Sequence, residues 1–148
     1  MAKEQLSGVR IERDSFGDIE VPAERHWGAQ TARSIRFFAI GDERMPLAVV
    51  HALAQVKAAA AETNAALGLL GTEERDLIVH AADEVVSGAL DDEFPLSVWQ
   101  TGSGTQTNMN ANEVIASRAN EIATGRRGGK SPIHRSEEHT SELQSRLH

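Results

Sequence analysis

Apolar residues recur at every third or fourth position through most of the chain, and this spacing predicts α-helices. The clearest helix is predicted from Pro46 to Leu67, because proline suits a first helical turn and Gly68 ends the pattern. Its expected buried face is rich in alanine and comprises Leu47, Val50, Ala54, Ala58, Ala61 and Ala65. Such small side chains favour helices that approach one another closely.

The same pattern predicts further helices and one extended element. Residues 72–88 form a helix with Thr72 as its expected N-cap, and with a buried face of Leu77, Ile78, Ala81, Ala82 and Val85. Residues 32–38 predict a short helix, and another begins near Asn108 and ends at Gly125. Residues 9–21 alternate partly between apolar and polar types around turn-forming residues, which indicates a hairpin or extended arm. The expected fold is therefore mainly α.

Composition and charge limit the kinds of partner. The 148 residues are 40% hydrophobic but include only four Phe, two Trp and no Tyr, so core packing must rest on aliphatic side chains. A net charge of -7 opposes non-specific binding to nucleic acid. It would also repel a small anionic substrate, so a site for one must be locally electropositive through backbone dipoles or cationic side chains.

The chain has no cysteine, which excludes disulfides and thiolate metal sites and favours a reducing compartment. Residues 1–7 lack the apolar stretch of a signal peptide and the arginine-rich character of a transit peptide. No segment is long and apolar enough to span a membrane. We therefore expect a cytoplasmic protein, and the sequence indicates no metal and no cofactor.

Uncharged polar residues are concentrated between Thr101 and Asn112, where ten of twelve residues carry a hydroxyl, an amide or no side chain. Gly102 and Gly104 allow the backbone to fold back with its N–H groups exposed, and the following helix directs its positive N-terminus at the same place. Such a loop suits a carboxylate. A loop that only caps a helix has the same composition, so both interpretations stay open, whereas the glycine and lysine pattern of a nucleotide phosphate loop is absent.

Longer motifs around this loop resemble one enzyme family. Residues 99–110, Trp-Gln-Thr-Gly-Ser-Gly-Thr-Gln-Thr-Asn-Met-Asn, are similar to the substrate loop of class II fumarate hydratases, which belong to the fumarase and aspartase superfamily. Residues 10–22, 27–31 and 91–96 resemble the same enzymes in the same order, so the resemblance covers residues 9–134. It implies the N-terminal domain of that superfamily without the central helical bundle.

The resemblance implies a lyase that hydrates fumarate reversibly to (S)-malate in the tricarboxylic acid cycle, as a homotetramer and without a cofactor. It also implies that Ser103, Gly104 and Thr105 contact a carboxylate of the dicarboxylate substrate, which agrees with their donor-rich chemistry. Trp99 and Ser103 favour the hydratase over aspartate ammonia-lyases, which typically have tyrosine and alanine there. An aspartate ammonia-lyase or another superfamily lyase is the nearest alternative. A non-catalytic helical binding module is the alternative from another class.

The histidines receive different interpretations. His26, His51 and His80 match no catalytic position of the family pattern, so we assign them no acid or base role. His134 resembles the start of the His-Pro-Asn-Asp segment that forms the family's second, non-catalytic dicarboxylate site. Residues 135–137 are Arg-Ser-Glu instead of Pro-Asn-Asp, so we expect that site to be incomplete and His134 to be exposed.

Residues 135–148 match no fumarase and look like an in-frame translation of a common DNA-sequencing adapter. A polar C-terminal helix is the competing interpretation, but it offers only Leu143 and Leu147 to a core. We therefore divide the chain into an incomplete lyase domain, residues 1–134, and a non-family tail, residues 135–148. The family's catalytic histidine and mobile serine loop lie downstream, so no catalytic residue is expected here, and the isolated chain is expected to be inactive.

Overall fold

A computed structural model describes residues 8–134 and has a mainly α-helical fold with one small antiparallel sheet, as predicted. The expected tail, residues 135–148, lies outside the described residues. Along the chain the elements are β1 (Val9–Asp14), β2 (Gly17–Pro22), α1 (Ala29–Phe37), α2 (Leu47–Ala66), α3 (Thr72–Val86), the 3-10 turn η1 (Asp91–Glu93) and α4 (Thr105–Thr124). None of the helices described is long and apolar enough to cross a membrane.

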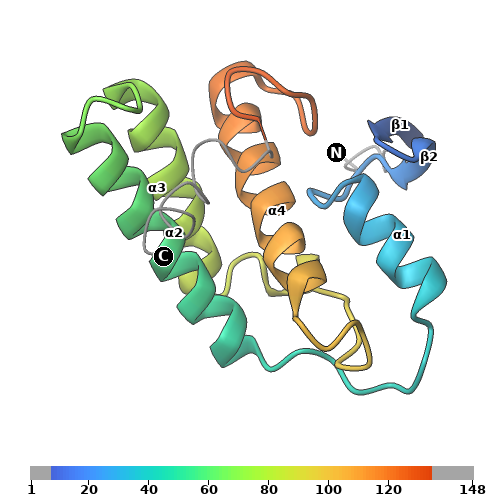
Figure 1. Ribbon diagram of the computed structural model, residues 1–148. Coiled ribbons are helices and arrows are strands. Elements are labelled where there is room, and N and C mark those ends of the chain that lie inside the picture. Colours follow the sequence, from blue (N-terminus) through green and yellow to red (C-terminus); the bar gives the residue numbers. More distant parts are fainter. Residues whose placement is uncertain (1–7, 135–148) are drawn as a thin grey trace, which may run out of the picture.

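Helix α4 is the centre of the fold. Helices α2 and α3 pack beside each other on one side of it, while α1 and the β1–β2 hairpin lie on the other (Figure 1). Eleven of its twenty residues are buried, including every residue from Asn110 to Ser117. The middle of α4 is therefore covered nearly all round, while its two ends reach the surface.

The core confirms most of the predicted apolar faces. Val50, Ala54 and Ala61 of α2 are fully buried, as are most of the predicted positions of α3. Leu47 is an exception, since it lies 41% exposed at the first residue of α2. The buried face of α2 also carries Lys57, which the apolar pattern did not single out.

Two predicted helix starts are wrong. Thr72 is the first residue of α3 and not its cap; Gly71 holds that position, and its N–H donates to Glu74 Oε2 at 3.0 Å. Helix α4 begins at Thr105, three residues before the predicted start at Asn108. Side chains close in sequence make the capping contacts, Glu74 at α3 and Gln100 at α4, and helical periodicity does not report such contacts.

Helix α1 begins against a carboxylate from α4. Glu113 is 3% exposed and accepts hydrogen bonds from the backbone N–H groups of Gly28 at 2.6 Å, Gln30 at 2.7 Å and Thr31 at 3.2 Å. A negative charge at a helix N-terminus is stabilising. Gly28 leaves room for this approach, because a Cβ there would lie 3.2 Å from Glu113 Cδ and the carboxylate would have to shift slightly. The contact fixes α1 and the hairpin relative to α4.

The hairpin is joined to α1 by a partly buried ion pair. Asp14, at the end of β1, accepts hydrogen bonds from Arg33 Nε at 2.8 Å and Nη2 at 3.0 Å. This hydrogen bonding, together with the charge of Asp14, raises the pKa of the Arg33 guanidinium against the cost of its desolvation. The predicted hairpin is thus confirmed, and it is held as part of the α1 side of the molecule.

Candidate functional site

The polar glycine loop lies directly before α4. Gly104 is the N-cap of the helix and has φ 70° and ψ 12°, a left-handed conformation that residues other than glycine adopt at a cost. Its N–H donates to the carbonyl of Thr101 at 3.1 Å, which closes the loop into a turn. The turn ends where the first amides of α4 face outward, and these have no acceptor within the helix.

Hydroxyl groups surround this helix start. Ser103 Oγ lies 2.9 Å from Thr105 Oγ1, and Thr101 Oγ1 donates to Gln106 Oε1 at 2.5 Å. Ser103 and Thr105 are exposed, and Gly104 is half-buried between them. The structure therefore brings the predicted residues Ser103, Gly104 and Thr105 together as one donor-rich surface that a carboxylate could contact from solvent.

Thr107 does not belong to this surface. It is 4% exposed, and its hydroxyl accepts a hydrogen bond from Gln100 Nε2 at 2.7 Å. Gln100 Oε1 also accepts the backbone N–H of Thr107 at 3.0 Å, so one amide side chain caps the first turn of α4 from the loop. Thr107 therefore fixes the loop from inside, and the exposed donors are left to Ser103 and Thr105.

The beginning of the loop is held by a carboxylate from the segment before α2. Trp99 Nε1 donates to Glu43 Oε2 at 3.0 Å, although the indole is 54% exposed. This hydrogen bond is the main reason that the pKa of Glu43 lies below its usual value. The loop is thus attached at Trp99 and at Gln100. Two residues before Trp99, the Ser97 hydroxyl donates a further hydrogen bond of 2.8 Å to the Ile40 carbonyl.

A buried cation lies behind the loop. Lys57 of α2 is 6% exposed, and its Nζ donates to Asn108 Oδ1 at 2.7 Å. Asn108 is in the first turn and a half of α4, one helical turn beyond Thr105. The sequence carried a signal for this burial, because Lys57 falls on the helical face of Val50, Ala54 and Ala61.

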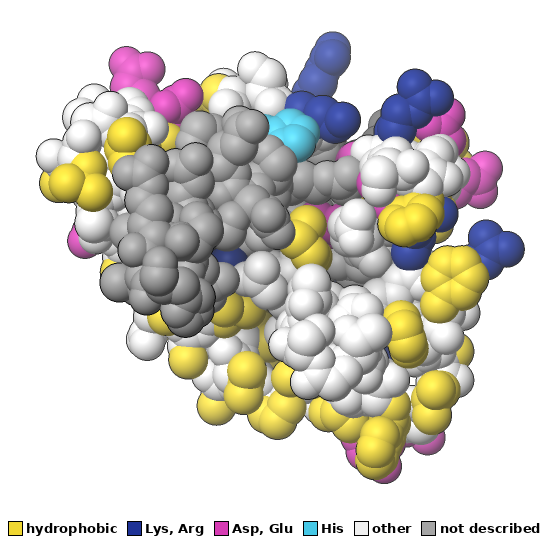
Figure 2. Space-filling model, in the orientation of Figure 1, with side chains coloured by type: hydrophobic (Ala, Val, Ile, Leu, Met, Phe, Trp, Pro, Cys, Tyr) yellow, Lys and Arg dark blue, Asp and Glu magenta, His cyan; other side chains and the backbone are white. Residues whose placement is uncertain are grey.

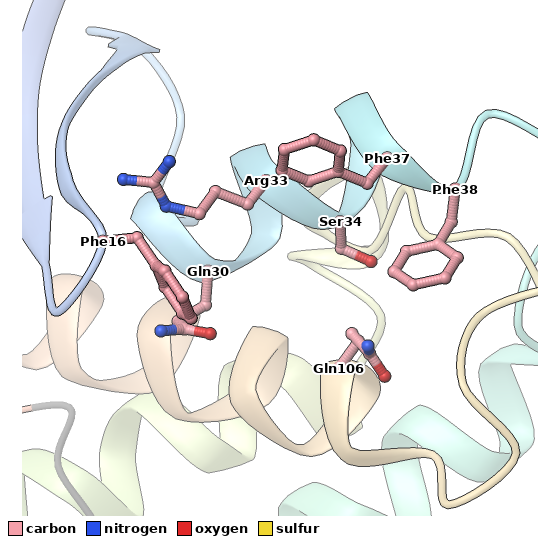
Figure 3. A pocket seen from close by; sticks show the side chains of 7 residues that line it. All are labelled: Phe16, Gln30, Arg33, Ser34, Phe37, Phe38 and Gln106. Carbon is pink, nitrogen blue, oxygen red and sulfur yellow. The ribbon is translucent and has the colours of Figure 1, made fainter.

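A cavity of about 320 Å³ opens next to the loop, between the hairpin turn, α1 and the start of α4 (Figure 3). Aromatic side chains dominate its lining, which comprises Phe16, Gln30, Arg33, Ser34, Phe37, Phe38 and Gln106. Its cation, Arg33, is engaged by Asp14 and lies 5.8 Å from the ring centre of Phe16. The cavity is thus an apolar space whose one guanidinium is already neutralised, which suits a carboxylate less well than the loop does.

A second charged cluster lies away from the loop, around His26. This histidine is 5% exposed, its Nε2 lies 2.7 Å from Glu121 Oε2, and its backbone N–H donates to Glu93 Oε2 at 2.8 Å. Arg118 also contacts Glu121 at 2.8 Å and Glu84 at 2.5 Å. The cluster joins α3, η1 and α4 to the turn before α1, so its role in the fold is structural.

We predict that this cluster makes the fold sensitive to acid. Burial opposes ionisation of Glu121, but hydrogen bonds from Arg127, His26 and Arg118 outweigh it and lower its pKa from 4.5 to about 2. The ionised Glu121 therefore contributes its full stabilisation at a pH above the ordinary pKa of 4.5, and this contribution is lost as the pH falls towards about 2. Urea unfolding between about pH 6 and about pH 3 should show this fall, and Glu121→Gln should flatten it. An unchanged profile in the variant would contradict the assignment, and Glu62→Gln on exposed α2 surface is the control.

His134 lies far from the loop. Asn120, near the end of α4, accepts from the Ile133 N–H at 2.8 Å and donates to the Ile133 carbonyl at 2.8 Å, which places His134 beside that end. Fifteen residues of helix separate Asn120 from Thr105, a distance of about 22 Å. His134 is half-buried, so the expectation that it would be exposed is wrong. Clusters of three or more histidine, aspartate or glutamate side chains suited to a metal ion are absent from residues 8–134.

Comparison with known proteins places most of the described residues in one family. A family model described as "Lyase" matches residues 17–143. Class II fumarate hydratase of Thermosynechococcus vestitus is 63% identical over 126 residues, which are 85% of this chain and 27% of that protein. Fumarate hydratase class II 1 of Pseudomonas aeruginosa is 62% identical over 136 residues, which are 92% of this chain and 29% of that protein.

Solved structures agree with the sequence relatives. The crystal structure of recombinant class II fumarase from Schistosoma mansoni superimposes with a TM-score of 0.86 at 48% identity, over 90% of this chain and 28% of that chain. A Brucella melitensis structure described as fumarate lyase:delta crystallin gives a TM-score of 0.83 at 40% identity, over 88% and 29%. The chain therefore spans less than a third of the length of the proteins that it matches.

Proposed function

Because this chain belongs to the lyase family and matches class II fumarate hydratases within it, we propose that its parent protein hydrates fumarate reversibly to (S)-malate. In this proposal the chain is the N-terminal part of that enzyme and contributes one half of a dicarboxylate site. In this proposal residues 1–134 form an incomplete lyase domain and residues 135–148 a tail foreign to the family, into which the match with the lyase family model extends as far as residue 143.

The observation that carries the proposal is the donor-rich start of α4. Ser103 and Thr105 present hydroxyls 2.9 Å apart beside a left-handed Gly104, and the helix behind them adds outward-facing amides. These groups carry no formal charge, so they can bind a carboxylate in a protein whose net charge is -7 without importing a surface cation. In the proposed site Ser103, Gly104 and Thr105 contact one carboxylate of the substrate.

This contact would assist the reaction as well as hold the substrate. Hydration of fumarate adds water across its double bond. The reverse reaction removes a proton from the carbon beside a carboxylate and then releases hydroxide from the neighbouring carbon, which restores the double bond. Negative charge then accumulates on that carboxylate, and hydrogen bonds from fixed donors become stronger as it does. The residues that transfer the proton are proposed to lie in the part of the enzyme beyond this chain.

The exposed apolar surface supports assembly into a larger protein. Figure 2 shows hydrophobic side chains gathered along the lower and right-hand parts of one face of the molecule. Phe16 is 79% exposed, Phe37 68%, Val56 60% and Leu67 63%, and such surface is typical of an interface. We propose a homotetrameric, cytoplasmic enzyme of the tricarboxylic acid cycle, in which further chain and partner subunits cover these positions.

His134 is proposed to be a remnant of the family's second dicarboxylate site. Asn120 holds the preceding residue in place, as described above, so the approach to that site is present. The Pro-Asn-Asp that follows histidine in the family is replaced by Arg135, Ser136 and Glu137, which lie outside the described residues. The proposed second site is therefore incomplete in this chain.

We predict that the isolated chain binds a dicarboxylate weakly and does not turn it over. Titration with succinate should shift the backbone amide resonances of Ser103, Gly104 and Thr105, while neutral succinamide should not, because the helix start selects negative charge. Fumarate absorbance should stay constant in the presence of the chain. Turnover above the buffer rate would contradict the division of the site, and an absence of succinate-dependent shifts would contradict the site itself.

The coding sequence beyond His134 separates the proposal from its alternatives. Recovery of an in-frame Pro-Asn-Asp and a later Gly-Ser-Ser-x-Met-Pro loop would support the hydratase, and residues 135–148 would then be discarded. A natural stop codon near residue 148 would support a non-catalytic helical module instead. The chain is also similar to the Brucella melitensis lyase structure, and an aspartate ammonia-lyase is the nearest alternative. The assay should therefore include aspartate as a substrate.

A further inference from the structure

Lys57 and Asn108 form a hydrogen-bonded pair behind the loop, in which the donor and the acceptor atoms are unambiguous. Lys57 Nζ is only a donor, so the 2.7 Å contact identifies the facing atom of Asn108 as its amide oxygen. The amide nitrogen of Asn108 is therefore turned away from Lys57. Within residues 8–134 this nitrogen donates to no protein acceptor, and the side chain is half-buried.

The side chain of Asn108 extends towards the proposed carboxylate site. Thr105 and Asn108 are three residues apart on α4, so their side chains share one face of the helix, with Cβ atoms about 5–6 Å apart. Helical side chains lean towards the N-terminus, which here is the end that carries Ser103 and Thr105. The amide nitrogen thus faces the same region as the hydroxyls of the loop.

Lys57 adds the charge that the loop lacks. No residue from Thr101 to Asn112 is charged, whereas Lys57 is 6% exposed and lies one hydrogen bond behind that segment. A buried charge is screened less by salt and water than a surface charge, so its attraction for an anion extends over several ångströms.

We infer that Lys57 is a positioning residue of the dicarboxylate site, and that Asn108 is a further contact to the bound carboxylate. Lys57 holds the amide of Asn108 with its nitrogen towards the ligand and supplies the positive charge of the site through it. The inference rests on the proposed function and deepens it, because it names the source of electropositive potential at a site built otherwise from uncharged donors.

A purely structural pair would behave differently from a positioning pair. If Lys57 only joins α2 to α4, then any partner that keeps the contact should preserve both the fold and ligand binding. Asn108→Asp makes this distinction, because aspartate is nearly isosteric and would pair with Lys57 even more strongly. It removes the amide donor that faces the ligand, so a positioning role predicts a loss of binding in a folded protein.

The test is succinate titration of the full 148-residue chain, with the dissociation constant measured from amide shifts. Lys57→Met keeps the length of the side chain but removes its charge, and we expect it to raise the dissociation constant about tenfold. Lys130→Met is the matched control, since it removes the same charge from an exposed position and should change the constant by less than about twofold. Asn108→Asp should weaken binding at least as much as Lys57→Met, with an unchanged helical circular dichroism spectrum.

Two results would overturn the inference in different ways. Wild-type affinity in both Lys57→Met and Asn108→Asp would show that the pair is structural, while the proposed function would stand. If Lys57→Met does not fold, Asn108→Asp decides alone. Failure of the unaltered chain to bind succinate would remove the proposed site and this inference together.

Discussion

Glu113→Ala is expected to destabilise the protein by about 3 kcal/mol or more, because it removes a buried carboxylate that accepts backbone N–H groups from the start of α1. The N–H groups of Gly28 and Thr31 would lose their acceptor in the interior, where water cannot fully replace it. The free energy of unfolding would be measured from the urea dependence of helical circular dichroism.

Matched variants separate this capping contact from the general effect of removing a glutamate. Glu62→Ala removes the same atoms from an exposed position of α2 and should change stability by less than about 0.5 kcal/mol. Glu113→Gln keeps the shape but turns one acceptor into a donor that faces an N–H, so it should remain clearly destabilising. Stability of Glu113→Ala equal to that of the exposed control would refute this account of how α1 is placed.

Gly104→Val is expected to weaken succinate binding by at least about tenfold, because a β-branched residue is strongly disfavoured at φ 70°. Space is not the obstacle, since a Cβ at Gly104 would have no atom within 4 Å. The backbone would have to leave the left-handed conformation, and the relative positions of Ser103 and Thr105 would change with it. The dissociation constant from the amide titration measures the effect.

Gly102→Ala is the control for this change. A Cβ at Gly102 would also meet nothing within 4 Å, and its φ lies outside the left-handed range. We expect near wild-type succinate affinity for Gly102→Ala, and an intact core in both variants because the loop is exposed. Equal affinities of Gly104→Val and Gly102→Ala would show that the conformation of Gly104 is unimportant for binding.

The order and type of the elements could be predicted because local signals agree there. Apolar spacing locates α2 and α3, glycine follows their ends, and partial alternation indicates the hairpin. The start of α4 was predicted three residues late, because Thr105 to Thr107 look like loop residues in isolation. Gln100 makes them helical by accepting the N–H of Thr107, and the pattern of apolar positions does not register that contact.

The buried charges were harder to foresee than the helices. Charged side chains are seldom buried, so Glu113 and Lys57 look like surface residues of amphipathic helices. Their partners lie 82–85 and 51 residues away in the sequence, and only the packing of α4 against α1 and α2 reveals them. Lys57 alone could have been suspected, because it interrupts an apolar helical face.

Some residues of the candidate site could be predicted from the sequence, while the roles of others became clear only from the structure. Ser103, Gly104 and Thr105 were chosen from composition and family resemblance, and the structure brings them to one helix start. Thr107 belongs to the same run of hydroxyl residues but points inward, which only its bonds to Gln100 show. His134 was expected to be exposed but is half-buried, and it follows Ile133, which pairs with Asn120 near the far end of α4.

Assay of the intact gene product with fumarate, malate and aspartate tests the central claim most directly. We expect loss of fumarate absorbance with formation of malate, the reverse reaction from malate, and no release of ammonia from aspartate. A product that carries the unaltered sequence from Thr101 to Asn112, is folded, and leaves both fumarate and malate unchanged would contradict the account.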